Sequence, residues 1–375
     1  MKRPLAALAL ALIALAACGG AAPPSPSGAA EGRASGSSSA AASASTSASP
    51  AVSKPATSAS SKPAASAAAS AAAAGSAQKI KMSYPVATVD MVPLWIASDK
   101  GLFTKYGANV DLQFIAPAPA SQALVAHSTD IYAGGPEGIN IRAQGGDVKY
   151  FGALAPLISG LALYGRKGSS EKAASDADIA GKTIAATNRE AQSDLFIREL
   201  LRQRGLDASK ANFVYTQTLP ASLAGLVAKQ FDFAVLSLPI VFQAEADPTL
   251  VAVVPPNGAP EVKINGVSLM AYTTWIQSHE AEAKGILEAI RDASNFARAN
   301  PDETQQIMSK YLKLDDKTIL KDSYDFEKDV WGRPDLTANA EAFGVALRYA
   351  SNASAKSETA ADLIYQDNKI AKSLS

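Results

Sequence analysis

Few side chains in this chain of 375 residues have the types and spacing that catalysis requires. The sequence holds two histidines, His127 and His279, and one cysteine, Cys18. Because no second histidine and no thiol lies near either histidine, neither a zinc site nor a Cys-His pair can be assembled. No Gly-x-Ser-x-Gly elbow and no Walker-type phosphate loop occurs. We expect no enzymatic activity, no metal and no cofactor, although a Ser-His-Asp triad stays open by count alone.

Cys18 directly follows a segment with the features of an export signal. Lys2 and Arg3 form a positive n-region, and residues 5–17 are uncharged, apolar and end in small residues. This stretch is shorter than the about 20 residues that a membrane-spanning helix needs. It resembles the bacterial lipoprotein signal, which implies cleavage before the cysteine and a diacylglyceryl thioether on its sulfur. We predict that residues 1–17 are removed and that Cys18 is a lipid anchor; an ordinary secretory signal is the alternative.

The next segment predicts a tether. Residues 19–78 consist almost wholly of Ala, Ser, Pro and Gly, with no aromatic residue. Such a composition cannot bury enough apolar area to offset the backbone entropy lost on folding, about 1–2 kcal/mol per residue. A flexible chain of about 60 residues has an end-to-end distance of roughly 40–45 Å. We therefore expect residues 18–78 to hold a folded domain away from a membrane surface.

The remainder of the chain has the composition and periodicity of an α/β protein. Short alternating strands are expected at 80–84, 110–114, 131–133, 149–154, 161–165, 183–186, 213–215, 233–236, 251–254 and 267–272. Helices are expected between them at 93–100, at 124–126, after the break at 134–136 up to 144, and at 192–204 and 220–229. Further helices are expected at 279–299, from 300, and at 316–324, 337–350 and 360–369. Strands that alternate with helices at this spacing indicate largely parallel sheets, followed here by a helical tail.

The overall charge excludes one class of partner. The chain has 35 basic and 35 acidic residues, with no basic cluster interleaved with aromatic side chains. Nucleic-acid binding needs a positive surface that opposes the phosphates, so this sequence gives it no support.

An ordered series of residues resembles a known family. The order of the following residues is the one found in one family: Tyr84, Pro93-Leu94, Ala97, Lys100-Gly101-Leu102-Phe103, Gly107, Val110, Ala123-Leu124, Asp130 and Asp178-Ile179-Ala180-Gly181-Lys182-Thr183-Ile184. The family is that of the bacterial ABC-transporter solute-binding lipoproteins for alkanesulfonate, taurine, nitrate and thiamine-pyrimidine precursors (SsuA/THI5-like, NMT1-type). The resemblance covers about residues 80–350.

The resemblance implies a type II periplasmic-binding-protein fold, with two α/β lobes joined by a two-strand hinge. Lobe 1 would comprise 79–163 and 269–375, lobe 2 would comprise 164–268, and the strands at 161–165 and 267–272 would be the hinge. It also implies an exported, lipid-anchored monomer that captures a small polar organic solute between its lobes and delivers it to an ABC permease. A ligand-sensing lipoprotein for a membrane receptor, or an enzyme like the thiamine-pyrimidine synthase, are the alternatives.

The candidate site follows from a rule on α/β sheets, whose ligands bind beyond the carboxyl ends of the strands. This rule selects the loops 85–91, 116–121, 134–137, 188–193 and 237–239. The ligand-binding residues expected within them are Asp90, Met91, Ser121, Gly135, Glu137, Arg189, Gln192 and Ser237. Trp95, Trp275 and Trp331 are expected to pack rather than to bind.

The identity of the solute stays open at this point. Sulfonate and nitrate binders of the family usually carry a Gly/Ser-rich turn at the first helix of lobe 2, whereas residues 188–192 here read Asn-Arg-Glu-Ala-Gln. This departure disfavours a sulfonate or nitrate ligand. Asp90 and Glu137 facing Arg189 would instead suit a zwitterion or an amine-bearing heterocycle.

Overall fold

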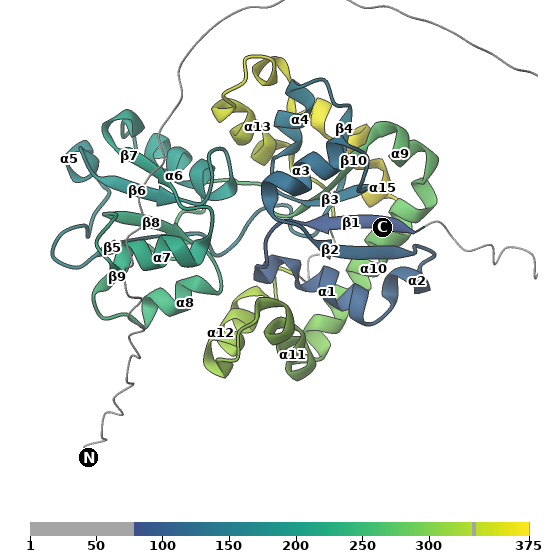
Figure 1. Ribbon diagram of the computed structural model, residues 1–375, viewed down its shortest axis with the longest axis horizontal. Coiled ribbons are helices and arrows are strands. Elements are labelled where there is room, and N and C mark those ends of the chain that lie inside the picture. The colour runs from purple at the N-terminus through teal and green to yellow at the C-terminus, as the bar shows by residue number, and fades with distance from the viewer. Residues whose placement is uncertain (1–78, 332–334, 375) are drawn as a thin grey trace, which may run out of the picture. The chain divides into compact units, whose positions relative to one another are not determined.

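The computed structural model describes residues 79–331 and 335–374 (Figure 1). The predicted signal, the anchor Cys18 and the tether lie outside these residues. Within them, the strands form two separate five-stranded sheets.

The first sheet has the strand order β2-β1-β3-β10-β4. Strand β1 pairs in parallel with β2 and β3, while β10 runs antiparallel between β3 and β4. Its strands are β1 (Ile80–Tyr84), β2 (Val110–Phe114), β3 (Ile131–Gly134), β4 (Val148–Ala153) and β10 (Ser268–Tyr272).

The second sheet repeats this arrangement with the order β7-β6-β8-β5-β9. Strand β6 pairs in parallel with β7 and β8, and β5 runs antiparallel between β8 and β9. Its strands are β5 (Ala162–Arg166), β6 (Thr183–Ala186), β7 (Asn212–Tyr215), β8 (Phe233–Leu236) and β9 (Leu250–Val254). Both sheets are therefore mixed rather than purely parallel, because each takes in one strand where the chain crosses over.

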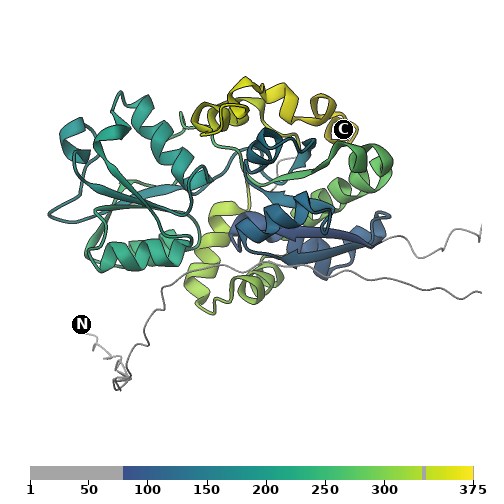
Figure 2. The same ribbon diagram turned by 45° about the horizontal axis from the view of Figure 1, so that its top comes forward.

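Helices cover both sheets, and each sheet with its helices forms one lobe. The helices between the strands, in chain order, are α1 (Val92–Asp99), α2 (Leu102–Lys105), α3 (Pro117–Val125), α4 (Gly138–Ala143), α5 (Asp176–Ile179), α6 (Gln192–Gln203), α7 (Leu219–Val227) and α8 (Ile240–Glu245). The tail holds α9 (Thr273–Ser278), α10 (Glu280–Ala299), α11 (Pro301–Leu312), α12 (Lys317–Glu327), α13 (Ala340–Tyr349), α14 (Ala360–Leu363) and α15 (Lys369–Lys372). Figures 1 and 2 both show the teal segment, β5 to β9, as a group of its own beside the remaining elements.

Most predicted elements are present, and the short helices α2, α5 and α9 are additional to them. The helix expected over 360–369 is broken, because Gln366, Asp367 and Asn368 have positive φ angles. Helix α8 was not expected, since the run after Ser237 reads as a short apolar stretch without a clear period. Helix α6 packs as predicted, with Leu195, Phe196, Leu200 and Leu201 buried.

The chain passes between the lobes in two crossing segments, residues 154–161 and 255–267. These segments hydrogen-bond to each other, with Leu154 N donating to Val267 O at 2.8 Å and Ile158 N to Ile264 O at 2.9 Å. The strands predicted to be the hinge are instead β5 and β10, each inside a sheet. The crossing takes place in the residues immediately before each of them. The exact lobe limits, 79–163 with 269–375 and 164–268, stay a prediction.

No helix in the described ranges is both long and apolar enough to cross a bilayer.

Candidate functional site

A cleft of about 840 Å³ lies between the two lobes and is lined by residues of both. All eight residues expected at the site line this cleft: Asp90, Met91, Ser121, Gly135, Glu137, Arg189, Gln192 and Ser237. Its volume is within the 300–1,000 Å³ that small-molecule sites occupy. That these side chains bind a ligand stays a prediction.

The strand topology explains why these residues converge. Asp90 and Met91 lie in the 3₁₀ helix η1 (Val89–Met91) after β1, and Gly135 and Glu137 follow β3. In the other lobe, Arg189 and Gln192 follow β6, and Ser237 follows β8. The carboxyl ends of parallel strands meet at one edge of a sheet, so each lobe presents its loops at a single edge.

Asp90 is the most buried charged residue that lines the cleft, with 5% of its surface exposed. Its Oδ1 has no hydrogen-bond partner among the described residues. Burial raises its pKa from 3.8 to about 6, against the opposing effect of the Thr88 side chain. A carboxyl group that is removed from water without a cation nearby favours its neutral form.

A second buried carboxyl stands beside Asp90. Glu327, at the end of α12, is fully buried, and its Oε2 also lacks a partner among the described residues. Burial and then the charge of Asp90 raise the pKa of Glu327 well above its ordinary value. The Ser159 hydroxyl, in the first crossing segment, donates to Glu327 Oε1. Two adjacent buried carboxyls cannot both ionise at low cost, so they titrate as a pair.

Glu137 is another buried carboxyl group, and it lines the cleft as Asp90 does. Burial raises its pKa, while its own backbone amide and Tyr132 lower it by smaller amounts. Its Oε2 is without a hydrogen-bond partner in the described chain. A Cβ at Gly135 would come within 3.2 Å of this oxygen, so glycine leaves room for the Glu137 carboxyl.

The remaining expected residues differ in their exposure and in whether the protein already occupies their hydrogen-bonding groups. Gln192 Nε2 donates to Asn265 O in the second crossing segment at 2.7 Å, and the Ser121 hydroxyl donates to Pro117 O at 3.2 Å. Ser237 and Met91 are buried. Arg189 is exposed and makes no ion pair within the described ranges. Gln192 therefore holds its loop in place, and Arg189 is available to a ligand.

Two glutamates that the sequence did not single out connect the lobes. Glu190 accepts from Asn140 Nδ2 at 3.0 Å and from Ser351 N at 2.9 Å, both in lobe 1. Glu199 on α6 accepts from Arg348 and the Tyr349 hydroxyl of α13, at 2.9 Å each. No spacing in the sequence could have shown these pairs, because the partners are between 50 and 161 residues apart.

Glu199 is also bound from its own helix. Arg202 Nη2 and Gln203 Nε2 donate to Glu199 Oε1 at 2.6 and 2.9 Å. Burial alone would raise the pKa of Glu199, but these donors, Tyr349 and the charge of Arg348 lower it to about 2. The carboxylate is therefore ionised at neutral pH and ties α6 to α13.

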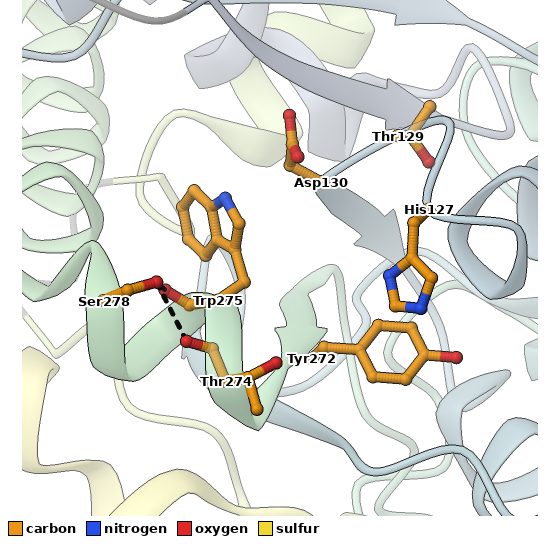
Figure 3. Close-up of a pocket in the computed structure, with 7 residues that line it drawn as sticks. All are labelled: His127, Thr129, Asp130, Tyr272, Thr274, Trp275 and Ser278. Carbon is orange, nitrogen blue, oxygen red and sulfur yellow. Dashed lines mark hydrogen bonds between the residues drawn. The ribbon is translucent and has the colours of Figure 1, made fainter.

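A second pocket, of about 250 Å³, lies apart from the cleft at the opposite edge of the first sheet (Figure 3). His127 packs against Tyr272 with ring centroids 4.3 Å apart, and Trp275 stacks on His279 at 4.8 Å. Trp275 therefore lies outside the cleft, and Trp95 and Trp331 are buried as expected. Figure 3 shows Asp130 on the far side of the Trp275 ring from Thr274.

The pKa of Asp90 gives a prediction for stability. Its folded-state pKa lies above 3.8, so between about pH 4 and 6 the folded protein binds more protons than the unfolded chain, and stability falls as pH rises. Asp90→Asn removes this group. The free energy of unfolding should therefore fall less between pH 4 and pH 7 in the variant than in the wild type, by up to about 3 kcal/mol. Urea unfolding at both pH values measures the difference.

The matched control is Asp329→Asn, which removes one exposed carboxylate two residues from Glu327. It should leave the pH dependence of the wild type unchanged. A pH dependence of Asp90→Asn equal to that of the wild type would show that Asp90 titrates normally.

Comparisons with known proteins agree with this geometry. A protein of Brucella abortus (strain 2308), named as a presumed binding protein, is 26% identical over 223 residues, which are 59% of this chain and 67% of its own. The periplasmic aliphatic sulphonate binding protein SsuA from Escherichia coli superposes with a TM-score of 0.62 at 18% identity, covering 77% of this chain and 92% of that one. The periplasmic nitrate-binding protein NrtA from Synechocystis PCC 6803 superposes with a TM-score of 0.56 at 18% identity, covering 65% of this chain and 69% of that one.

One solved structure with the same fold is an enzyme. The desulfurization enzyme DSZB superposes with a TM-score of 0.55 at 17% identity, covering 79% of this chain and 98% of its own. At such identities these likenesses establish the fold, which is the type II periplasmic-binding-protein fold predicted from the sequence. The family described as NMT1/THI5 like matches residues 88–304, more than half of the chain. The chain therefore belongs to the NMT1/THI5-like family.

Proposed function

We propose that this protein is the solute-binding component of an ABC import system, which captures a small polar organic solute in its cleft and delivers it to a permease. The observation that carries the proposal is the cleft of about 840 Å³, lined by loops from the strand ends of both sheets. The family and the binding proteins among its structural relatives support it.

Binding without chemistry suits the residues present. The lining of the cleft contains neither histidine nor cysteine, and His127 and His279 lie elsewhere. The described residues also hold no group of three or more side chains placed to bind a metal ion. The hydroxyl groups of the lining, such as that of Ser237, therefore have no histidine in the cleft to act as their base.

The mechanism follows from the connection between the lobes. The two crossing segments form a narrow link, and motion about such a link opens and closes a cleft. Glu190 and Glu199 tie the lobes on the side of α13. A solute that touches both lobes adds contacts that exist only when they are together, and so it shifts the population toward the closed form. The closed form then docks on the permease.

The N-terminal part completes the proposal. Cleavage before Cys18 and lipidation of its sulfur would hold the protein at the outer face of the cell membrane as a monomer. Each acyl CH₂ that enters the bilayer contributes about 0.8 kcal/mol, so several chains give a stable anchor. Residues 18–78 would let the folded part reach the permease.

Solute capture is tested together with the tie between the lobes. Solute released from the natively purified protein and added back should raise the melting temperature, since it binds the folded protein alone. Arg348→Ala removes one bond to Glu199 across the lobes. It should increase the radius of gyration without solute, and it should weaken solute binding about five-fold, for a loss of about 1 kcal/mol.

Arg202→Ala is the matched control. Arg202 donates to the same Glu199 from the same helix, and its side chain is 47% exposed against 45% for Arg348. Since this bond stays within lobe 2, the variant should change neither the radius nor the affinity. Equal effects of the two variants would disprove the tie, and a protein that neither retains nor binds any solute would disprove the function.

The anchor is tested at Cys18. Cys18→Ser removes the only thiol and hence the acceptor of the lipid. The variant should appear in the soluble fraction after cell fractionation, whereas the wild type sediments with membranes. Sedimentation of both proteins with membranes would rule out lipidation at this residue.

A further inference from the structure

The helix ends at the cleft are poorly suited to bind an anion. An anion at a helix N-terminus needs free backbone N–H groups. Helix α3 begins Pro117-Ala118-Pro119, so two of its first three residues carry no N–H, and α7 loses one N–H of its first turn to Pro220. In α6 the Asp194 carboxylate, which pairs with Arg198 at 2.8 Å, already accepts the Glu190 N–H at 2.9 Å, so this donor is not free for an anion.

The buried carboxyl groups of the cleft need hydrogen-bond donors rather than acceptors. Asp90 Oδ1 and Glu137 Oε2 are acceptors without a partner among the described residues. The cations in the lining, Arg189 and Lys313, are exposed to solvent. A buried acceptor without a donor costs about 1–3 kcal/mol, and more when it is charged. A ligand that donates hydrogen bonds and carries positive charge would remove this cost.

The pair behind the cleft strengthens this requirement. Glu327 adds a second buried carboxyl beside Asp90, and it accepts a hydrogen bond from the neutral hydroxyl of Ser159. Thr88 is likewise neutral. A cation placed against Asp90 would therefore attract the charge that the two carboxyls carry, and this attraction is weakly screened at a buried site.

The walls of the cleft indicate what the rest of the ligand is like. Four large apolar side chains in the described residues are exposed, and two of them, Val86 and Phe114, line the cleft. Phe114 is 58% exposed. Ile139, Ile158 and Leu219 line the cleft as well. Exposed apolar side chains gathered at a cavity are typical of a surface that a ligand covers.

Resting on the function proposed above, we infer that the solute carries a protonated amino group on an apolar body, with the ammonium donating to the carboxyl of Asp90. The apolar body lies against Val86 and Phe114. This assignment differs from the sulphonate and nitrate in the names of the structural relatives, and the prolines at the helix ends and the unpartnered buried carboxyls account for the difference.

The experiment uses a panel of matched small molecules on the solute-free protein. Primary amines, alcohols, carboxylates and sulfonates are compared on the same butyl, cyclohexylmethyl, benzyl and phenethyl skeletons, by thermal shift and then by calorimetry. We expect the amines to raise the melting temperature and the alcohols of the same skeleton to do so far less. Asp90→Asn should weaken amine binding at least ten-fold, and Asp329→Asn should not change it.

Each outcome decides the inference. Preference for sulfonates or carboxylates, or amine binding that is unaltered in Asp90→Asn, would overturn it while leaving solute capture intact. Equal binding of amines and alcohols to the wild type would overturn it as well, and this comparison needs no variant, so it holds even if Asp90→Asn does not fold. If no member of any class binds while the solute released from the natively purified protein still does, the inference falls and solute capture stands; if the released solute also fails to bind, solute capture falls as well.

Discussion

The hydrogen-bonded pair of crossing segments is the constraint on which the rest of this structure depends. Leu154 and Ile158 bind Val267 and Ile264, so the two passages between the lobes run side by side. Each passage leads into a strand, β5 or β10, that runs antiparallel to its neighbours inside a sheet. The remaining strands of each sheet therefore end at the same edge, and the loops that follow them line one cleft.

Buried charge in this molecule is treated in two different ways. Glu199 receives donors from Arg202, Gln203, Arg348 and Tyr349, so it is ionised and holds two helices together. Asp90 and Glu327 pair with no cation of the described residues, and burial raises the pKa of both. The first arrangement stabilises a connection between lobes. The second leaves a need for a donor at the cleft, as expected of a site that is completed by a ligand.

Much of the fold was predictable because its signals are local. Period-two alternation located strands such as β1, and the apolar face with a glycine stop located α6. The break at Gln366 and the short helix α8 were missed, because a left-handed residue and a six-residue apolar run give no period. The candidate site was predictable from topology, since the loops after parallel strands must converge, and Asp90 and Arg189 do line one cleft. Glu327 and Glu199 were not, because their partners are set by tertiary packing over more than 140 residues.

A crystal structure of the protein, purified natively and crystallised without added solute, tests the central claim most directly. The account predicts density for a small organic molecule in the cleft, touching residues of both lobes, with one polar atom within hydrogen-bond distance of Asp90. A cleft filled by the protein's own side chains, or a bound molecule found only in the pocket beside His127 and Trp275, would contradict it.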